Sequence, residues 1–385
     1  MLLFYILSPL TAILLYTVYA YNIKTIESKH LWSLAIMIAV YLGLLNTTKE
    51  IVSDLQAYHY DFSIVKNYDI FTYLTGYGKE PLYYGYTYIG YYLFFGNWKL
   101  FLISITVINY VLTSYCIIKI SKKNNIDPKN TIVALFIMAF FFQSFASTSQ
   151  LIRQVLCQSI TMVFLTRLYL ENKKNWWIAV CAVLVHSSCI PILGLAIIPS
   201  IKERFTIKGL AKLIIPLGIL IVIFYAVATY LTSLPFVGYI FARALNMNFG
   251  TDGWQTNVGL QKSMLALLLM LLYIAVFLYF KLDKDKKLPA IGLVNINIVL
   301  IFLLFLCNFI GAYFIQSRYF FFVYSFQNFI IVMFLDKFKL TNNNIVRYTI
   351  MTGVLFYFFY NYTHNIFSYS SFSEAVLKLL PEYFI

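Results

Sequence analysis

Long apolar stretches separated by short polar segments recur along the whole chain. Most approach the roughly 17 to 25 residues that an α-helix needs to cross the hydrocarbon core of a bilayer. Inside lipid every backbone polar group must be satisfied within the protein, so such stretches predict helices rather than open sheets. Ten membrane spans are predicted, at residues 3–20, 31–45, 100–120, 131–146, 151–170, 213–231, 264–280, 290–314, 319–335 and 348–360.

Basic residues gather in six short loops between these stretches, and such loops are typical of the cytoplasmic side of a membrane protein. If all six loops are cytoplasmic, an even number of crossings joins each loop to the next. The stretch 176–199 then forms a short hairpin, whose arms meet at His186-Ser187-Ser188. The stretch 81–95 becomes a re-entrant or surface-lying helix. A single crossing by 176–199 is the alternative.

The same parity places both chain termini on the outer face, together with the two larger loops, 46–80 and 235–262. These loops are the only ones large enough to contribute a site. The sequence contains no linker, low-complexity tract or detectable internal repeat. We therefore expect one integral membrane domain over residues 1–385, folded as an all-α transmembrane bundle.

Composition narrows the function. With 61% hydrophobic and 11% charged residues, the chain has too few charges to cover the surface of a soluble domain. The net charge of +14 comes from lysines dispersed between apolar stretches, which favours membrane orientation over nucleic-acid binding. The five cysteines show no metal-ligand spacing, and nucleotide-binding and hydrolase motifs are absent from the sequence. We predict no metal and no cofactor.

Half of the arginines lie on the predicted outer side, where the positive-inside rule disfavours basic residues. Of six arginines, Arg153, Arg243 and Arg318 fall at or near predicted outer helix ends. The planar guanidinium pairs bidentately with phosphate, so outward arginines favour a pyrophosphate-bearing ligand delivered from the membrane. The alternative is that each arginine caps a helix or pairs with a carboxylate.

A polar stripe opens the predicted span 151–170. Its members recur with the spacing of one helical face and include Arg153 and Gln154. In lipid this face must point toward a cavity or toward partner helices. Interhelical hydrogen bonding explains the amides well and the arginine poorly. The stripe consists of Gln150, Arg153, Gln154, Cys157, Gln158 and Thr161.

Three residues are candidates for a general base. Asp54 lies in the first outer loop, Glu80 directly precedes Pro81 at a predicted helix start, and His186 lies at the hairpin apex. A carboxylate or imidazole in these places suits proton abstraction from a sugar hydroxyl. The alternatives are stabilisation of the helix dipole by Glu80 and simple packing of His186.

Tyrosines surround these carboxylates in the sequence. Tyr58, Tyr83 and Tyr84 offer ring faces that suit binding of a pyranose ring. Tyrosines are also enriched where membrane proteins meet the lipid headgroups, so interfacial anchoring is the competing interpretation.

The order of these features resembles the EpsG family, relatives of the Wzy-type O-antigen and capsular polysaccharide polymerases. The resemblance covers roughly residues 54–335. It is carried by Asp54-x-x-x-Tyr58, Glu80-Pro81, Arg153-Gln154, His186-Ser187 and Arg318-Tyr319.

The resemblance implies a GT-C-like glycosyltransferase of the bacterial inner membrane. Such an enzyme moves a glycan from undecaprenyl pyrophosphate onto a lipid-linked repeat unit at the periplasmic or outer leaflet, with inversion. Arg153 and Arg318 would hold pyrophosphate, Gln154 would orient it, and Arg243 would assist. A chain-length regulator is a candidate partner. The alternatives are a lipid-linked oligosaccharide flippase or other transporter, an O-antigen ligase, and a membrane acyltransferase. The sequence does not specify the sugars or the linkage.

Overall fold

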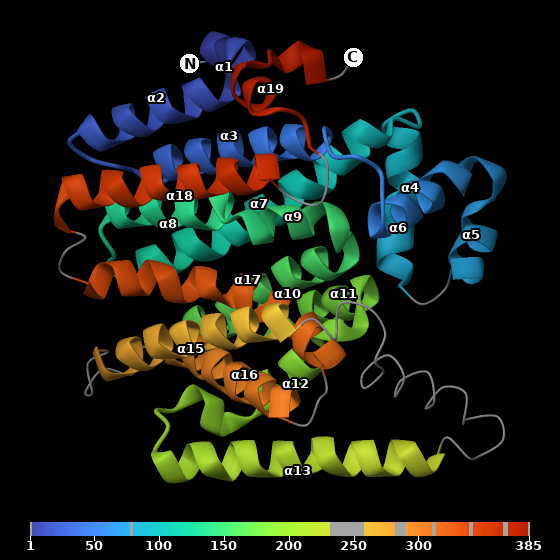
Figure 1. Cartoon of the computed structure of the whole chain (residues 1–385), viewed down its shortest axis with the longest axis vertical. Coiled ribbons are helices and arrows are strands. Elements are labelled where there is room, and N and C mark those ends of the chain that lie inside the picture. Colours follow the sequence, from blue (N-terminus) through green and yellow to red (C-terminus); the bar gives the residue numbers. More distant parts are fainter. Residues whose placement is uncertain are drawn as a thin grey trace. The chain divides into compact units, whose positions relative to one another are not determined.

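The computed structural model describes residues 2–77, 80–231, 258–281, 290–309, 313–338, 342–364 and 369–383. Within these ranges all regular structure is helical, as predicted (Figure 1). The chain divides into two compact units, Met1–Leu193 with Ile331–Ile385, and Gly194–Ile330. The single domain expected from the sequence stays a prediction.

The first unit holds most of the helices. They are α1 (Leu2–Leu7), α2 (Pro9–Asn22), α3 (Ser28–Asn46), α4 (Asp54–Ser63), α5 (Ile70–Tyr77), α6 (Pro81–Leu93), α7 (Trp98–Lys123), α8 (Pro128–Phe140), α9 (Phe142–Gln150), α10 (Ile152–Leu170), α11 (Trp176–Val185), α18 (Asn344–His364) and α19 (Phe372–Leu377). The second unit contains α13 (Ile207–Leu231), α15 (Val258–Lys281) and α16 (Ile291–Phe309). Two further helices, α12 (Ile190–Ile197) and α17 (Tyr313–Lys337), cross the division between the units.

Helices α3, α7 and α10 form the centre of the first unit, with α7 packed against both of the others. At Gly43 of α3 the missing side chain allows close approach, because a Cβ there would lie 3.2 Å from Ile103 of α7. The buried amide of Asn46 donates hydrogen bonds to Thr106 of α7 and to Thr148 of α9. These bonds join the C-terminal ends of α3 and α9 to the N-terminal half of α7.

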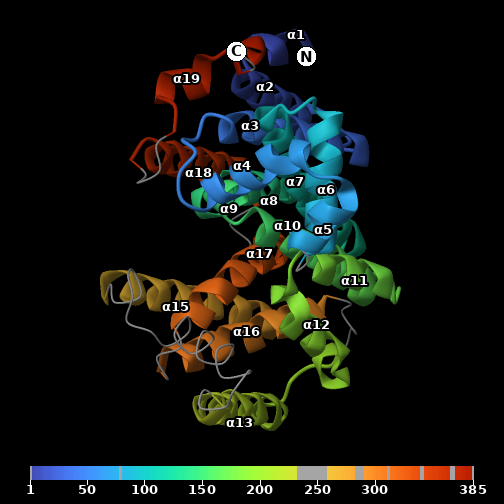
Figure 2. The same cartoon turned by 90° about the vertical axis from the view of Figure 1, so that its right-hand side faces the viewer.

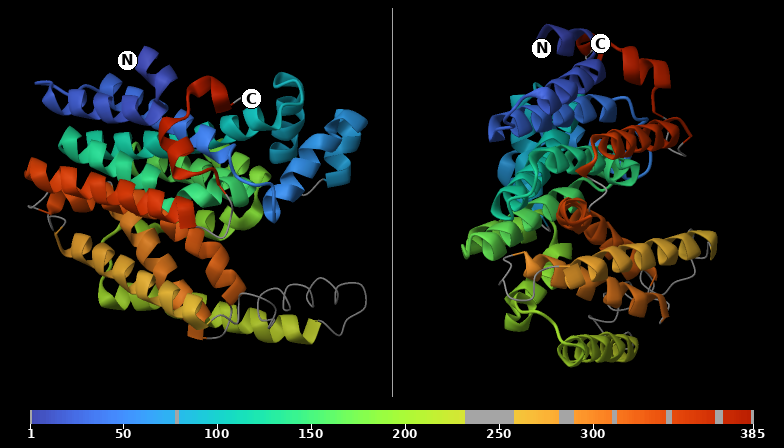
Figure 3. Two further views of the ribbon diagram at one scale, coloured as in Figure 1. Left: turned by 45° about the horizontal axis from the view of Figure 1, so that its top comes forward. Right: turned by 90° about the vertical axis from the view of Figure 1, so that its left-hand side faces the viewer.

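Short helices cover the end of the unit where α3 and α9 end. Helices α4, α5 and α6 lie together there, and α6 also packs against α7 and α11 (Figure 2). Away from it, α2, α3, α8 and α18 run alongside one another (Figure 3). The first unit therefore consists of a bundle of longer helices with a cap of short helices at one end.

Apolar helices of membrane-spanning length confirm a helical membrane protein. Among the described residues, Ser28–Asn46, Trp98–Lys123, Ile291–Asn308 and Tyr319–Lys337 qualify by length and composition, and α8 with α9 qualifies as a bent pair. Helix α10 has 19 residues, but the polar stripe makes it less apolar. The number of ten spans stays a prediction.

Two predicted spans are not single straight helices. Residues 3–20 divide into α1 and α2 at Ser8, because Pro9 disfavours helical geometry in the residue before it. With 14 residues, α2 is roughly 21 Å long and too short to cross a bilayer alone. Residues 131–146 fall on α8 and α9, which meet at an angle of 50°.

The two ambiguous stretches form short helices, as expected. Residues 81–95 coincide with α6, whose 13 residues are too few for a crossing. Residues 176–199 give α11 and α12, interrupted at His186 and a short 3₁₀ turn, Ser187–Cys189. The break at His186 agrees with the predicted meeting point of the two arms, and the hairpin itself stays a prediction. A re-entrant or surface-lying position for α6 stays a prediction.

Candidate functional site

An ion pair joins two residues that the sequence analysis selected separately. Glu80 immediately precedes α6, and Arg153 is the second residue of α10. Arg153 Nη1 donates to Glu80 Oε2 at 2.6 Å. The Glu80 side chain is only 9% exposed, whereas that of Arg153 is 30% exposed. Glu80 makes no capping bond to α6, so its carboxylate serves Arg153 rather than the helix end.

His186 lies on the other side of the same carboxylate. Its Nε2 is 3.5 Å from Glu80 Oε1, while its Nδ1 accepts a hydrogen bond from the Ser188 backbone N–H at 3.1 Å. An acceptor Nδ1 bears no proton, so the neutral ring carries its proton on Nε2, facing Glu80. The thiol of Cys157 donates to the His186 carbonyl at 3.1 Å and holds the loop against α10. The Glu80 carboxylate therefore lies between the guanidinium of Arg153 and the imidazole of His186.

The buried face of α10 agrees with the predicted polar stripe. Cys157, Gln158 and Thr161 are all buried within the protein. Gln154, although adjacent to Arg153 in sequence, is buried and points along a different direction of the helix from Arg153, since successive helical residues are about 100° apart. The role of Gln154 in orienting pyrophosphate stays a prediction.

The three predicted sugar-binding tyrosines surround Arg153. Its guanidinium lies 5.3 Å from the centre of the Tyr58 ring and 5.8 Å from that of Tyr83. Arg153 Nη1 also lies 3.3 Å from the hydroxyl of Tyr84. All three tyrosines are buried, so they support the arginine through cation–π and hydrogen-bond contacts. Their binding of a sugar stays a prediction.

Asp61 is a member of the cluster that sequence reasoning did not select. Its Oδ2 accepts a hydrogen bond of 3.4 Å from the Tyr84 hydroxyl, and its backbone carbonyl accepts one from Tyr73. Burial raises the pKa of Asp61, and nearby Arg153 offsets part of this effect. The signal was present, because Asp54, Tyr58 and Asp61 recur with helical spacing on one face of α4.

The contacts described above do not include Asp54, and the side chains of the other two candidates lie outside the described part of the structure. Asp54 is exposed in the first turn of α4. Arg318 belongs to α17, and its side chain lies outside the described part of the structure. Arg243 lies outside the described residues. In the part of the chain that the structure describes, no group of three or more His, Cys, Asp or Glu residues is arranged to hold a metal ion.

Chemically, the Glu80–Arg153–His186 cluster combines a proton acceptor with a cation. The carboxylate of Glu80 is a general-base candidate, and the guanidinium of Arg153 is suited to a developing phosphate charge. Arg153 Nε lies buried without a hydrogen-bond partner. This nitrogen is a donor that suits an anionic ligand.

Apolar helices of membrane-spanning length indicate a multi-pass membrane protein, and the Glu80–Arg153 ion pair is its candidate site. The model of the EpsG family matches residues 30–373, nearly the whole chain. The protein therefore belongs to the EpsG family, a Wzy-type polymerase-like family of polysaccharide biosynthesis. No curated protein and no solved structure matches it.

Proposed function

We propose that the protein is a polysaccharide polymerase that joins undecaprenyl-pyrophosphate-linked repeat units, and that the Glu80–Arg153–His186 cluster is its catalytic centre. The observation that carries the proposal is the contact of Glu80 with both Arg153 and His186. These residues come from three distant parts of the chain, and all three lie within the segment matched by the family. A base and a cation are the two groups that glycosyl transfer from a pyrophosphate donor requires.

Glu80 acts as the base. The acceptor hydroxyl oxygen attacks the anomeric carbon of the donor glycan, and the bond from that carbon to the pyrophosphate oxygen breaks with its electron pair. The hydroxyl proton passes to Glu80 and then to solvent. A single displacement inverts the configuration at the anomeric carbon. His186, whose Nε2–H faces Glu80, orients the carboxylate. Asp54 stays the alternative base, as an exposed carboxylate on the neighbouring helix α4.

Arg153 stabilises the departing pyrophosphate. In the resting state its positive charge pairs with Glu80, which favours the ionised form of that carboxylate. A bound pyrophosphate competes for the same guanidinium and weakens this pairing. Glu80 then holds a proton more readily, since an opposite charge has been drawn away. Donor binding in this way prepares the base for the acceptor.

We place the reaction at the periplasmic or outer leaflet of a bacterial inner membrane, with lipid-linked glycans as both substrates. Two observations support a site at one membrane surface: the cluster lies where α6 and α10 begin, and α3 and α9 end beside each other at the Asn46–Thr148 hydrogen bond. A lipid-linked oligosaccharide flippase would instead need cations along a transmembrane path. An O-antigen ligase would share the donor and differ in its acceptor.

The test is deletion of the gene in its host, followed by analysis of surface glycan. We expect single repeat units in place of polymer, because unit synthesis and export continue without polymerisation. Wild-type protein should restore polymer. Arg153→Ala should not, although it should reach the membrane at the wild-type level.

Other outcomes identify the alternatives. Loss of all surface glycan, with lipid-linked units accumulating on the cytoplasmic leaflet, would indicate a flippase. Polymer that is made but remains on its lipid carrier would indicate a ligase. Full polymerisation with Arg153→Ala would show that this cluster is not the catalytic centre.

A further inference from the structure

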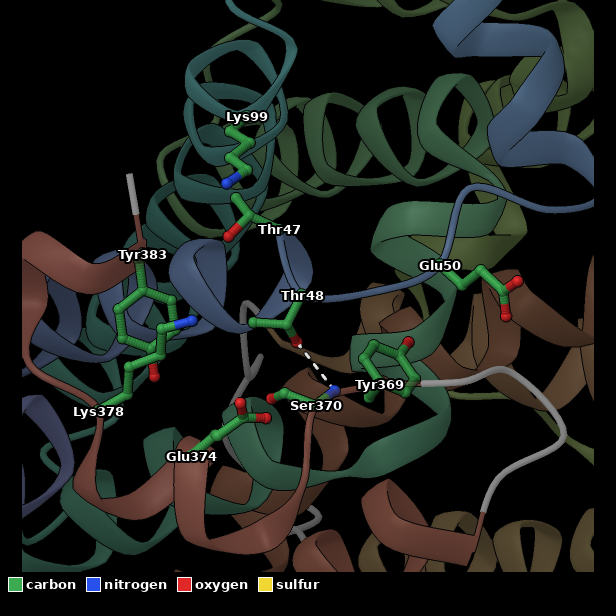
Figure 4. A pocket seen from close by; sticks show the side chains of 9 residues that line it. All are labelled: Thr47, Thr48, Glu50, Lys99, Tyr369, Ser370, Glu374, Lys378 and Tyr383. Carbon is green, nitrogen blue, oxygen red and sulfur yellow. Dashed lines mark hydrogen bonds between the residues drawn. The ribbon is translucent and has the colours of Figure 1, made fainter. Parts of the chain in front are cut away.

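Two adjoining pockets lie beside the C-terminal end of α3. None of the residues that line them belongs to the Glu80–Arg153–His186 cluster. One has a volume of about 420 Å³ and the other about 400 Å³, and both are lined by Thr47 and Lys99. Figure 4 shows that Lys99 extends toward Thr47 in the larger pocket. Glu374 and Lys378 lie on the opposite side of that pocket. The smaller pocket adds Lys49 and has no acidic lining residue.

Lys99 is placed where a cation is unfavourable. It is the second residue of α7, and the positive end of a helix dipole disfavours positive side chains in the first turn. Among the described residues no carboxylate forms an ion pair with it. A lysine that gains nothing from its helix or from an acidic neighbour is suited to an external anion.

Lys49 brings a second positive charge to the smaller pocket. Its side chain is buried, with only 4% of the residue exposed, and its Nζ donates to the Ser149 hydroxyl at 3.2 Å. Burial lowers its pKa to about 8 and nearby Asp54 opposes this shift, so the side chain still carries a positive charge at neutral pH. Both lysines therefore favour an occupant with a phosphate-like charge.

The edge beside the smaller pocket is apolar. The turn that joins α6 to α7 exposes Leu93 and Phe95, and Phe95 is 95% exposed. Trp98, which lines the pocket, is the first residue of α7, and Trp is enriched at the level of lipid headgroups. A cationic pocket beside an exposed apolar edge matches an amphipathic lipid better than a free ion in solution.

We propose that the two pockets form a binding site for a lipid phosphate, with the phosphate between Lys49 and Lys99 and the hydroxyl-bearing headgroup in the larger pocket. There, the carboxylates of Glu50 and Glu374 accept hydrogen bonds from hydroxyls and disfavour a second phosphate. Phosphatidylglycerol and a glycosylated isoprenoid phosphate share this chemistry.

The lipid site is linked to the Glu80–Arg153–His186 cluster but does not depend on the proposed reaction. Ser149, which binds Lys49, precedes Arg153 by four residues across the junction of α9 and α10. Binding is measured without turnover, so failure of the lipid site and failure of the proposed function are distinguished.

The test measures lipid binding to the full-length protein in neutral detergent by native mass spectrometry. The probes are undecaprenyl phosphate that carries one sugar, phosphatidylglycerol and, as a zwitterionic control, phosphatidylcholine. We expect Lys99→Gln to weaken binding of a phosphate lipid about tenfold and Lys99→Arg to restore it. Lys66→Gln, which changes an exposed lysine in the same outer segment, should bind as wild type does.

Competition between the two anionic probes identifies the source of the phosphate. Displacement of the glycosylated undecaprenyl phosphate by equimolar phosphatidylglycerol supports a general anionic-lipid site, and resistance to displacement supports an isoprenoid ligand. The proposal is overturned if Lys99→Gln binds both probes as tightly as wild type, or if Lys66→Gln loses as much affinity.

Discussion

Arg153 and Arg347 are both paired with a carboxylate in the first unit, yet they use their guanidinium groups differently. Arg347 is 3% exposed, and its Nε, Nη1 and Nη2 donate to Asn130, Asn344 and Asp127. Arg153 is 30% exposed, directs Nη1 at Glu80 and leaves Nε buried without a partner.

The difference separates a structural clamp from a site. Arg347 joins the start of α8 to the start of α18, and each of its three nitrogens donates a hydrogen bond within the protein. Arg153 retains donor capacity and is held by aromatic rings rather than by amides. Substitution by lysine tests this contrast well, because lysine keeps the charge at both positions and removes the planar fork.

Of the substitutions that test this comparison, Arg153→Lys should have the largest effect on the reaction. We expect polymer formation to fall about 100-fold, since a point charge replaces a group that meets the departing pyrophosphate with two donors. The melting temperature in detergent should remain close to that of wild type. A rate near wild type would show that Arg153 contributes only charge.

Arg347→Lys should have the opposite profile. Loss of bonds from a buried guanidinium should lower the free energy of unfolding by about 3 kcal/mol. Polymer formation per folded molecule should be unchanged. Thermal unfolding and a rate normalised to folded protein measure the two quantities. A stable Arg347→Lys variant with a reduced rate would show that Arg347 also takes part in the reaction, and it would contradict the difference drawn between the two arginines.

Lys49 extends the comparison to a buried lysine. Its folded-state pKa of about 8 lies below the ordinary 10.5, so the unfolded chain binds the extra proton between these values. Stability should therefore rise as the pH increases from about 8 to 10.5, by about 2 kcal/mol. The control Lys49→Met should lack this contribution in the same unfolding series. Equal pH dependence of the two proteins would contradict the burial of a charged Lys49.

His186→Gln should give the smallest effect. The amide N–H of glutamine can replace the Nε2–H that faces Glu80, so we expect roughly a tenfold loss of rate. His186→Ala, which leaves the carboxylate without this donor, should lose more. Equal rates for the two variants would indicate that His186 only packs against Glu80.

The longer helices were predictable because their apolar runs exceed any competing local signal. Helices α3 and α7 begin and end within a few residues of the predicted spans. The division at Ser8 carried a local signal in Pro9 that the apolar run obscured. The bend at Phe141 carried no local signal, because neither glycine nor proline marks it. Its position depends on packing.

The members of the site were predictable, but their contacts were not. Glu80, Arg153 and His186 were each selected from residue type and position, whereas their meeting depends on how α6, α10 and α11 pack. The pairing of Arg347 with Asp127 could not be predicted either, because the two residues lie 220 positions apart in the chain. Tertiary packing decides both cases.

The central claim is that Glu80 removes the proton of the acceptor hydroxyl, and one measurement tests it most directly. Purified wild-type protein and Glu80→Gln are supplied with lipid-linked repeat units, and the polymer formed per folded molecule is measured. We predict polymer from wild type and a loss of at least about 100-fold for Glu80→Gln, which keeps a hydrogen-bonding side chain but no basic oxygen. Polymer formation by Glu80→Gln at the wild-type rate would contradict the account.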